Sequence, residues 1–334
     1  MTVVFSSCTI DITQGKGIFY LLHIGIIGLG AIGQRLMKQF LQHPHIEVVA
    51  VCDQLEPLAR ETAGSIRGAQ AYTMYQQLIA DPKVELVYVA VPPKFHFPIV
   101  MEALRAQKHI LCEKPLANSV EEAGEMLKVA TEANIIHAMN FPLNYGAAAT
   151  KFAELIRENY IGKLRRLQLA MHFPEWPRPW QKNNWVGNRE QGGFVLEVGV
   201  HFIQQTLKVF GDLKNIHTQL ELPTDPLKCE TGIIATAKLE DGTPVLIEGI
   251  SEIAGKEYIG FTAFGSEGTL SLENWGQLKA GKLGEELETI LIEDAAPNQL
   301  IDEIIKAVDG QKAELYDFEV GYKAQVILEQ LRKI

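Results

Sequence analysis

Short runs of consecutive apolar residues alternate with amphipathic segments through the first 140 residues of the chain. Apolar runs rich in β-branched residues lie at 21–27, 46–52, 84–91, 109–112 and 135–139, as expected for strands that are buried on both faces. Segments with helical spacing lie between them, ending near 42 and covering 55–63, 74–80, 95–107 and 119–133. This alternation predicts an open parallel sheet covered by helices.

The pattern changes beyond about residue 140. A helix is expected at 147–158, and long strand-like runs follow at 164–173, 215–222, 231–239, 245–250, 257–264 and 269–273. Tight-turn signals such as Asp241-Gly242 join several of them, which indicates an open and mostly antiparallel sheet. Helices at 298–308 and 317–333 are expected to end the chain. We therefore predict an α/β protein with a nucleotide-binding domain at 21–140 and an α+β domain at 141–334.

Composition narrows the class of protein. The chain has 334 residues, of which 47% are hydrophobic, so it is long enough for two domains. Its formal net charge of -10 argues against nucleic acid or an anionic membrane as the main partner. The four cysteines have no metal-ligand spacing, no metal site is predicted, and reduced thiols fit a cytoplasmic location. Residues 1–20 lack the features of a signal peptide, and the sequence leaves open whether they form a strand, an arm or an upstream start.

A glycine-rich turn follows the first predicted strand. It reads Gly28-Leu29-Gly30-Ala31-Ile32-Gly33 and opens a helix. In such a turn, the first glycine permits the tight bend, the second lets the backbone approach a diphosphate, and the third allows the helix to pack closely on the strand. The free N–H groups at the helix N-terminus favour negative charge. Since glycine clusters also make ordinary turns, the motif needs its context.

Asp53 supplies that context at the end of the second predicted strand, twenty residues after Gly33. A carboxylate at this position accepts hydrogen bonds from ribose hydroxyls and repels a 2′-phosphate. The next residue is Gln54, with no Arg or Lys beside it, so NAD is favoured over NADP. The alternative interpretation is that Asp53 caps the helix that begins near Glu56.

The carboxyl ends of parallel strands form the edge where ligands bind. The predicted topology brings the glycine turn, Asp53, the segment from Pro92 to His96, and Glu113-Lys114-Pro115 to this edge. Because proline follows it, Lys114 keeps an extended backbone. Its ammonium is suited to hydrogen-bonding a substrate hydroxyl and stabilising negative charge on that oxygen. The alternative is a solvated Glu-Lys pair in a loop.

A second group of candidate residues follows Gly192-Gly193. If a helix begins there, Glu197 and His201 are four residues apart and share one face. A histidine exchanges a proton near neutral pH, and a carboxylate one turn away fixes its tautomer. The alternative is a histidine that is buried in the core.

Three of the four tryptophans fall within a proline-rich loop, at Trp176, Trp180 and Trp185. Their indoles, beside Arg178 and Asn184, are suited to covering the apolar face of a sugar or aromatic ring. The same loop is equally suited to filling a domain or subunit contact.

With these motifs the chain, from about Leu22 to its end, resembles the glucose–fructose oxidoreductase, inositol dehydrogenase and rhizopine-catabolism (Gfo/Idh/MocA) family. The matching motifs are Gly28–Gly33, Val91-Pro92-Pro93-Lys94-Phe95-His96, Glu113-Lys114-Pro115, Gly192 to His201, and Gly265 to Leu270. The resemblance implies a Rossmann domain that binds NAD(P), with contacts from the glycine turn, Asp53, Val91, Pro92, Pro93, His96, Glu113 and Lys114. It also implies oxidation or reduction at a carbinol carbon.

Site roles are carried over by position. Lys114 matches the lysine that binds the substrate oxygen, His201 matches the histidine that exchanges its proton, and Glu197 stands where an aspartate is usual. Asn144-Tyr145 stands where many members have an arginine followed by an aromatic residue, which suggests a substrate that does not need that arginine. The expected substrate set is Lys114, Asn144, Tyr145, Trp176, Trp185, Glu197 and His201.

We therefore expect hydride transfer between a nicotinamide cofactor and the secondary alcohol or ketone of a sugar, cyclic polyol or dihydrodiol, in a homodimer or homotetramer formed through the second sheet. One alternative is a non-catalytic dinucleotide sensor, which would need neither Lys114 nor His201. Another is an aldehyde dehydrogenase of similar layout, which would need a cysteine nucleophile such as Cys112.

Overall fold

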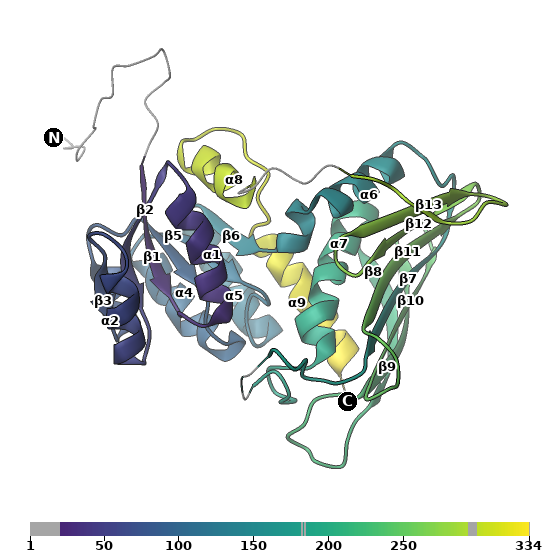
Figure 1. Ribbon diagram of the computed structural model, residues 1–334, viewed down its shortest axis with the longest axis horizontal. Helices are drawn as coiled ribbons and strands as arrows, with labels where there is room; N and C mark the ends of the chain where they lie inside the picture. Colours follow the sequence, from purple (N-terminus) through teal and green to yellow (C-terminus); the bar gives the residue numbers. More distant parts are fainter. Residues whose placement is uncertain (1–20, 182, 184, 293–298, 334) are drawn as a thin grey trace.

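Figure 1 shows the computed structural model, which describes residues 21–181, 183, 185–292 and 299–333. Two sheets lie at opposite sides of the molecule, with helices between them. The predicted N-terminal extension 1–20 lies outside the described residues, as does Asn298, the predicted start of the first of the two terminal helices.

The first sheet has six parallel strands in the order β3-β2-β1-β4-β5-β6. They are β1 (Leu22–Ile27), β2 (Ile46–Cys52), β3 (Gln70–Tyr72), β4 (Leu86–Val89), β5 (His109–Glu113) and β6 (His137–Asn140). The central strands β1 and β4 are almost fully buried, as their continuous apolar runs predict. The predicted parallel sheet is confirmed, and its strand order is that of the Rossmann fold.

Five helices connect these strands, namely α1 (Ala31–Gln42), α2 (Glu56–Gly64), α3 (Tyr75–Ala80), α4 (His96–Arg105) and α5 (Val120–Ala133). A short 3₁₀ helix, η1 (Pro93–Phe95), precedes α4. The predicted cap of α5 is present, because the Ser119 hydroxyl accepts a hydrogen bond from the Glu122 amide at 3.1 Å. These short connections leave the carboxyl ends of the strands at one edge.

The second sheet has eight strands in the order β14-β13-β12-β11-β7-β10-β9-β8. They are β7 (Leu164–Phe173), β8 (Leu213–Glu221), β9 (Gly232–Leu239), β10 (Pro244–Ser251), β11 (Tyr258–Gly265), β12 (Gly268–Glu273), β13 (Gln277–Lys282) and β14 (Glu288–Thr289). Among the described strand pairs of this second sheet, only β7–β10 is parallel. The predicted open and mostly antiparallel sheet is confirmed.

Helices α6 (Ala147–Arg157), α7 (Val200–Phe210) and α9 (Phe318–Arg332) lie between the two sheets (Figure 1). The buried face of the second sheet, with residues such as Leu169, Ile247 and Phe261, packs in one hydrophobic cluster with these helices. Two short turns of helix, η2 (Pro142–Tyr145) and η3 (Val195–Gly199), precede α6 and α7. Helix α7 therefore begins close to the first sheet, where it can complete a site at that sheet's edge.

The end of the chain returns to the first sheet. Helix α8 (Gln299–Val308) buries Leu300, Ile301, Ile304 and Ile305 in the cluster that contains Phe40 of α1 and Tyr88 of β4. Helix α9 packs against α5 as well as α7. Among the described residues, no helix has the length and apolar character needed to cross a membrane.

Candidate active site

The glycine turn between β1 and α1 has the geometry that its sequence predicts. Gly28 has φ +97°, and a Cβ there would lie 2.3 Å from the Ala90 carbonyl oxygen. A Cβ on Gly33 would lie 2.0 Å from the Gly28 carbonyl oxygen, so both glycines are required by the fold itself. Gly30 differs, because a Cβ there would meet nothing within 4 Å and its φ of -68° suits any residue. The space above Gly30 is therefore free for a ligand.

The start of α1 offers unpaired donors beside this space. Gly30 is the N-cap residue, no side chain caps the helix, and no acidic side chain lies in its first turn. The amides of Ala31, Ile32 and Gly33 are the first three of the helix, which lack acceptors inside an α-helix. A diphosphate fits this arrangement electrostatically and sterically.

Asp53 lies directly beside the turn. Its Oδ2 accepts a hydrogen bond from the Leu29 amide at 3.0 Å, and its Oδ1 accepts one from the Leu55 amide at 2.9 Å. The carboxylate thus joins the end of β2 to the glycine turn, and each oxygen retains lone pairs for a further donor. Leu55 is the N-cap residue of α2, so this bond lies in the loop before the helix, and Asp53 does not cap the first turn of α2 as the alternative interpretation expected. The expected contact with ribose hydroxyls stays a prediction.

His96 holds two loops of the same edge together. Its Nε2 lies 2.8 Å from the Val91 carbonyl oxygen and its Nδ1 lies 2.9 Å from the Pro115 carbonyl oxygen. The ring is fully buried, which lowers its pKa. Val91 and Pro92 remain partly exposed at this edge, whereas Pro93 is buried. Both ring nitrogens already face protein carbonyls. The expected contact of His96 with a cofactor stays a prediction.

Glu113 points into the sheet. Its Oε1 accepts hydrogen bonds from the Tyr88 hydroxyl and the Asn140 amide, both at 2.6 Å, so it ties together β4, β5 and β6. Burial raises the pKa of this carboxyl group. The side chain thus fixes the strand ends that precede Lys114. The expected cofactor contact of Glu113 stays a prediction.

Lys114 reaches across to the second half of the chain. Its ammonium donates to the Glu197 carbonyl oxygen at 3.1 Å and to Glu197 Oε2 at 3.2 Å. The two side chains are only 14% and 10% exposed, so the ion pair is largely shielded from water. Glu197 Oε1 is buried and has no hydrogen-bond partner among the described residues. The pair therefore keeps one acceptor oxygen free beside the ammonium.

Glycines shape the start of the helix that carries His201. A Cβ on Gly193, at φ +97°, would lie 2.3 Å from Glu230 Oε2, while Glu230 Oε1 accepts a hydrogen bond from the Val195 amide at 2.9 Å. A buried carboxylate thus caps the helix start, which needs the space that Gly193 leaves. The first turn, η3, is a π-helix.

The π turn changes the predicted relation between Glu197 and His201. Its i to i+5 hydrogen bonding moves residues four apart out of register on the helix surface. Glu197 binds Lys114, and His201 Nδ1 is buried with no hydrogen-bond partner among the described residues. The prediction that Glu197 fixes the tautomer of His201 is wrong for this structure. Glu197 nevertheless lies in the turn η3 that leads directly into α7, and His201 is in the first turn of α7.

His201 is held in its neutral form. Burial and the positive charges of Lys114 and Arg178 keep the pKa of this imidazole well below its usual range. Lys114 is thus near enough to His201 to act on its charge, although Lys114 follows strand β5 and His201 lies on helix α7. A neutral imidazole beside an ammonium is suited to accepting a proton from a hydroxyl group that the ammonium also binds.

The two other predicted substrate residues, Asn144 and Tyr145, contact different parts of the structure. Asn144 is 3% exposed, and its amide donates to Gln204 Oε1 on α7. The Tyr145 hydroxyl donates to the Glu314 carbonyl oxygen at 3.3 Å, and its ring contacts Tyr316 edge-on. Asn144 therefore contacts α7 at Gln204, about one turn after His201. Tyr145 connects η2 to Glu314 and Tyr316, which lie before α9.

The tryptophan loop contributes mainly to the core. Trp176 is 9% exposed and packs against Phe173 and Phe194, so the structure puts it inside the second domain's cluster. Trp185 is partly buried against the same cluster. Arg178, 8% exposed, donates to both carboxylate oxygens of Glu257 at 2.9 and 2.8 Å. Asn184 lies outside the described residues.

The sequence analysis did not identify Trp275. This residue follows β12, and its ring lies 5.4 Å from the His201 ring in an edge-on arrangement. The only local signal is a tryptophan next to glycine in a strand-to-strand turn, which does not indicate a site. Its place beside His201 depends on contacts between the turn after β12 and helix α7, which are distant in the sequence.

Two other possibilities receive no support. Cys112 is fully buried within β5, and burial raises the pKa of its thiol well above the usual value, which disfavours the thiolate that a nucleophile needs. Among the described residues, no group of three His, Cys, Asp or Glu side chains is placed to hold a metal ion.

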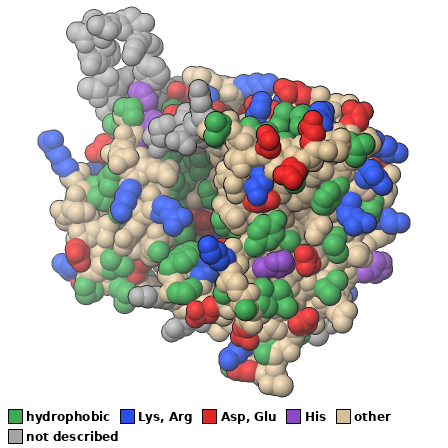
Figure 2. All heavy atoms as spheres, turned by 45° about the vertical axis from the view of Figure 1, so that its right-hand side comes forward, with side chains coloured by type: hydrophobic (Ala, Val, Ile, Leu, Met, Phe, Trp, Pro, Cys, Tyr) green, Lys and Arg blue, Asp and Glu red, His purple; other side chains and the backbone are tan. Residues whose placement is uncertain are grey.

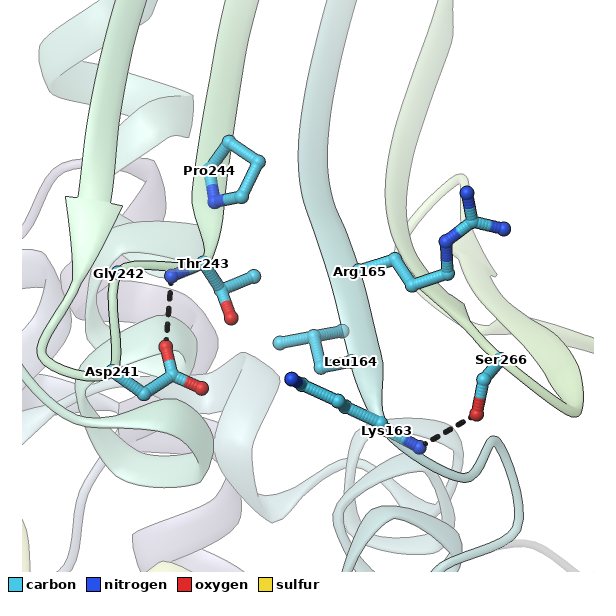
Figure 3. Close-up of a pocket in the computed structure, with 8 residues that line it drawn as sticks. All are labelled: Lys163, Leu164, Arg165, Asp241, Gly242, Thr243, Pro244 and Ser266. Atoms are coloured by element: carbon cyan, nitrogen blue, oxygen red, sulfur yellow. Dashed lines mark hydrogen bonds between the residues drawn. The ribbon is translucent and has the colours of Figure 1, made fainter.

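A separate hollow of about 510 Å³ lies at the other end of β7 (Figure 3). Its polar groups bond to one another: the Thr243 amide donates to Asp241 at 2.9 Å, and the Lys163 amide donates to Ser266 at 3.0 Å. Because β7 has ten residues, the hollow lies about 30 Å from the strand end that leads to Arg178. It is not part of the candidate active site.

Comparisons with known proteins agree with the fold of both parts of the chain. A family model described as "Oxidoreductase family, NAD-binding Rossmann fold" matches residues 22–141, and one described as "GFO/IDH/MocA C-terminal domain" matches residues 150–271.

Individual relatives cover most of the chain. The uncharacterised oxidoreductase YrbE of Bacillus subtilis (strain 168) is 24% identical over 75% of this chain and 73% of its own length. The dTDP-3,4-didehydro-2,6-dideoxy-alpha-D-glucose 3-reductase of Streptomyces violaceoruber is 28% identical over 75% of this chain and 72% of its own length. A levoglucosan dehydrogenase solved with NADH and L-sorbose superposes with a TM-score of 0.81 at 20% identity, covering 93% of this chain and 95% of that one.

Proposed function

Because the chain belongs to the Gfo/Idh/MocA family of NAD(P)-binding oxidoreductases, we propose that it moves a hydride between a nicotinamide cofactor and a secondary alcohol or ketone of a sugar, cyclic polyol or dihydrodiol. The main support for this proposal is that Lys114 contacts Glu197 just before the helix that contains His201, close enough to affect the charge of His201. The same residues serve oxidation and reduction.

The cofactor would be held by the turn from Gly28 to Gly33 and by Asp53. The space above Gly30 and the uncapped start of α1 fit a diphosphate, and the Asp53 carboxylate fits ribose hydroxyls. The absence of a basic residue directly after Asp53 supports NAD rather than NADP. When bound, the nicotinamide supplies the hydride acceptor or donor.

Lys114 and His201 would act on one oxygen of the substrate. In the oxidation direction the neutral imidazole takes the hydroxyl proton, and the ammonium stabilises the negative charge that grows on the oxygen. Glu197 holds the ammonium in place through its carbonyl and carboxylate oxygens. A largely shielded site strengthens these interactions, since water competes less for the charges.

Named relatives support the sugar class of substrate. One is a reductase of a dTDP-linked deoxyglucose derivative, and the levoglucosan dehydrogenase was solved with a sugar. Asn144 replaces the arginine expected at its position, so we propose a substrate without a phosphate or carboxylate at that end. Lys114, Glu197 and His201 would contact the reacting carbinol, with Trp185, Tyr145 and Asn144 further from it.

We also propose that two or four copies assemble through the outer face of the second sheet. In Figure 2 this side shows hydrophobic side chains interspersed with charged ones. Ile234 is 56% exposed and Phe264 is 37% exposed on this face, where His172 pairs with Glu248 at 3.6 Å. Light scattering should give a mass of at least two chains, and Ile234→Glu should shift the mass toward one chain.

The direct test of the function is a cofactor-reduction screen. Purified protein is incubated with NAD⁺ or NADP⁺ and a panel of sugars, inositols and dihydrodiols, and the absorbance of the reduced nicotinamide is followed. We expect turnover with at least one cyclic polyol, faster with NAD⁺. Tight NAD binding with no turnover on any member of the panel, in either direction, would instead favour a dinucleotide sensor.

A further inference from the structure

The indole of Trp275 packs against the start of helix α7, where it contacts His201 and Phe202. Its ring centroid lies 5.4 Å from that of His201, with the ring planes 84° apart, and 5.5 Å from that of Phe202. The residue is still 36% exposed. One part of the indole therefore packs on α7, and another part is open to solvent.

The turn that presents Trp275 is unusual. Asn274 and Trp275 both have left-handed backbone conformations, with φ of +46° and +74°. A bulky residue rarely adopts this conformation, which is strained and persists only where the surroundings impose it. Here the surroundings do so: the Asn274 amide donates to the Ile259 carbonyl oxygen at 2.9 Å, and Asn274 Oδ1 accepts from the Ile259 amide at 3.2 Å.

Arg178 supports the indole from another side. Its guanidinium lies 5.9 Å from the Trp275 ring and also lies over the rings of Phe173 and Trp176, at 5.0 and 5.3 Å. The two hydrogen bonds to Glu257 fix the guanidinium plane. Trp275 is thus held between a locked arginine and helix α7, which leaves the side chain little freedom to move aside.

We propose that Trp275 is a specificity-determining residue: its indole packs against the C–H face of the substrate ring and so places the carbinol at His201. This inference rests on the proposed function and adds a substrate feature to it, namely a ring with one apolar face. Aromatic surfaces suit such a face because they offer a large, rigid apolar area. Arg178 and Glu257 are positioning residues that act through the indole.

The test uses Trp275→Phe and Trp275→Leu with the best substrate from the screen. Trp180→Phe is the matched control, because Trp180 also lies 5.9 Å from Arg178, is 57% exposed and has no ring contact with His201 among the described residues. We expect Trp275→Leu to raise the substrate KM about tenfold to a hundredfold. The KM for the cofactor and the substrate KM of Trp180→Phe should stay within about twofold of wild type.

Two further readouts separate binding from folding. Substrate should quench tryptophan fluorescence in the wild type and in Trp180→Phe, and the quenching should be lost in Trp275→Phe. Trp275→Leu should also lose preference for cyclic over open-chain polyols of equal carbon number. Suppose that the wild type is active and that the Trp275 variants keep its substrate KM, its fluorescence quenching and its preference for cyclic polyols. That result would overturn the inference about Trp275 and leave the proposed function standing. If none of the polyols binds to the wild-type protein, both this inference and the proposed function are contradicted.

Discussion

The ammonium of Lys114, at the tip of β5, lies 3.2 Å from Glu197 Oε2 and 3.1 Å from the Glu197 carbonyl oxygen, just before the helix that carries His201. Residues 83 positions apart in the sequence thus join the edge of the first sheet to the turn η3 that precedes α7. This contact brings the positive charge of Lys114 near His201, where it helps to keep the imidazole neutral. The predictions below follow from that arrangement.

Replacing Lys114 should remove most of the turnover. Lys114→Met keeps the length of the side chain but lacks the charge that stabilises a substrate alkoxide. We expect kcat to fall about 10² to 10³-fold, the range for loss of one such donor. The measurement is steady-state kinetics on the best polyol, with Lys83→Met, on an exposed loop at the opposite end of the sheet, as the control. Near-normal kcat in Lys114→Met would refute its role.

Replacing His201 should have a separate signature. His201→Asn removes the proton acceptor and is expected to lower kcat about 10² to 10⁴-fold. The variant should also lose the acid limb of the pH–rate profile in the oxidation direction, since that limb reports the imidazole. A variant that retains the wild-type limb would show that another group takes the proton.

The acid limb should lie below the ordinary histidine pKa of about 6.5, because burial, Lys114 and Arg178 all lower the pKa of His201. Protonation of His201 then removes the base only at lower pH. In Arg178→Met one of the positive charges is gone, so the pKa rises and the acid limb moves toward neutral pH. Arg178→Lys keeps the charge and should shift the limb less. A shift of the limb to lower pH in Arg178→Met would contradict the electrostatic account.

Gly30 should matter to the cofactor and not to the fold. Since a Cβ there meets no protein atom within 4 Å, Gly30→Ala should leave the melting temperature within a few degrees of wild type. It should raise the Kd for NAD about tenfold or more, because the methyl group occupies space meant for the diphosphate. Gly64→Ala in α2, which also has open space, is the control. Calorimetry that finds equal NAD affinity in both variants would place the diphosphate elsewhere.

Much of the fold was predictable because its signals are local. The apolar runs of β1 and β4, the positive φ of Gly28, the close approach of Gly33 to Gly28 and the Ser119 cap are each signalled by residues near one another in the sequence, and the structure has all of these features. The terminal helix α8 was predicted as a helix, but its packing beside Phe40 of α1 depends on contacts across more than 250 residues. A hydrophobic pattern predicts that a face of a helix is buried, but it does not show which element covers that face.

The candidate site was predictable only in part for the same reason. Lys114 and His201 were identified by their motifs, whereas the partner of Glu197 was assigned wrongly because a π turn replaces the expected α turn. Trp275 was missed because its neighbour His201 lies 74 positions earlier in the sequence. The inward orientation of Glu113, set by Tyr88 and Asn140, likewise depends on strand pairing.

The central claim is that Lys114 and His201 act on the same substrate oxygen, and a double-mutant cycle on kcat/KM tests it most directly. Wild type, Lys114→Met, His201→Asn and the double variant are compared with one polyol and saturating NAD⁺. We predict that the double variant is about as slow as the slower single variant, because groups that act as a unit are not additive. Losses that multiply fully in the double variant would mean that the two residues act independently, which contradicts the account.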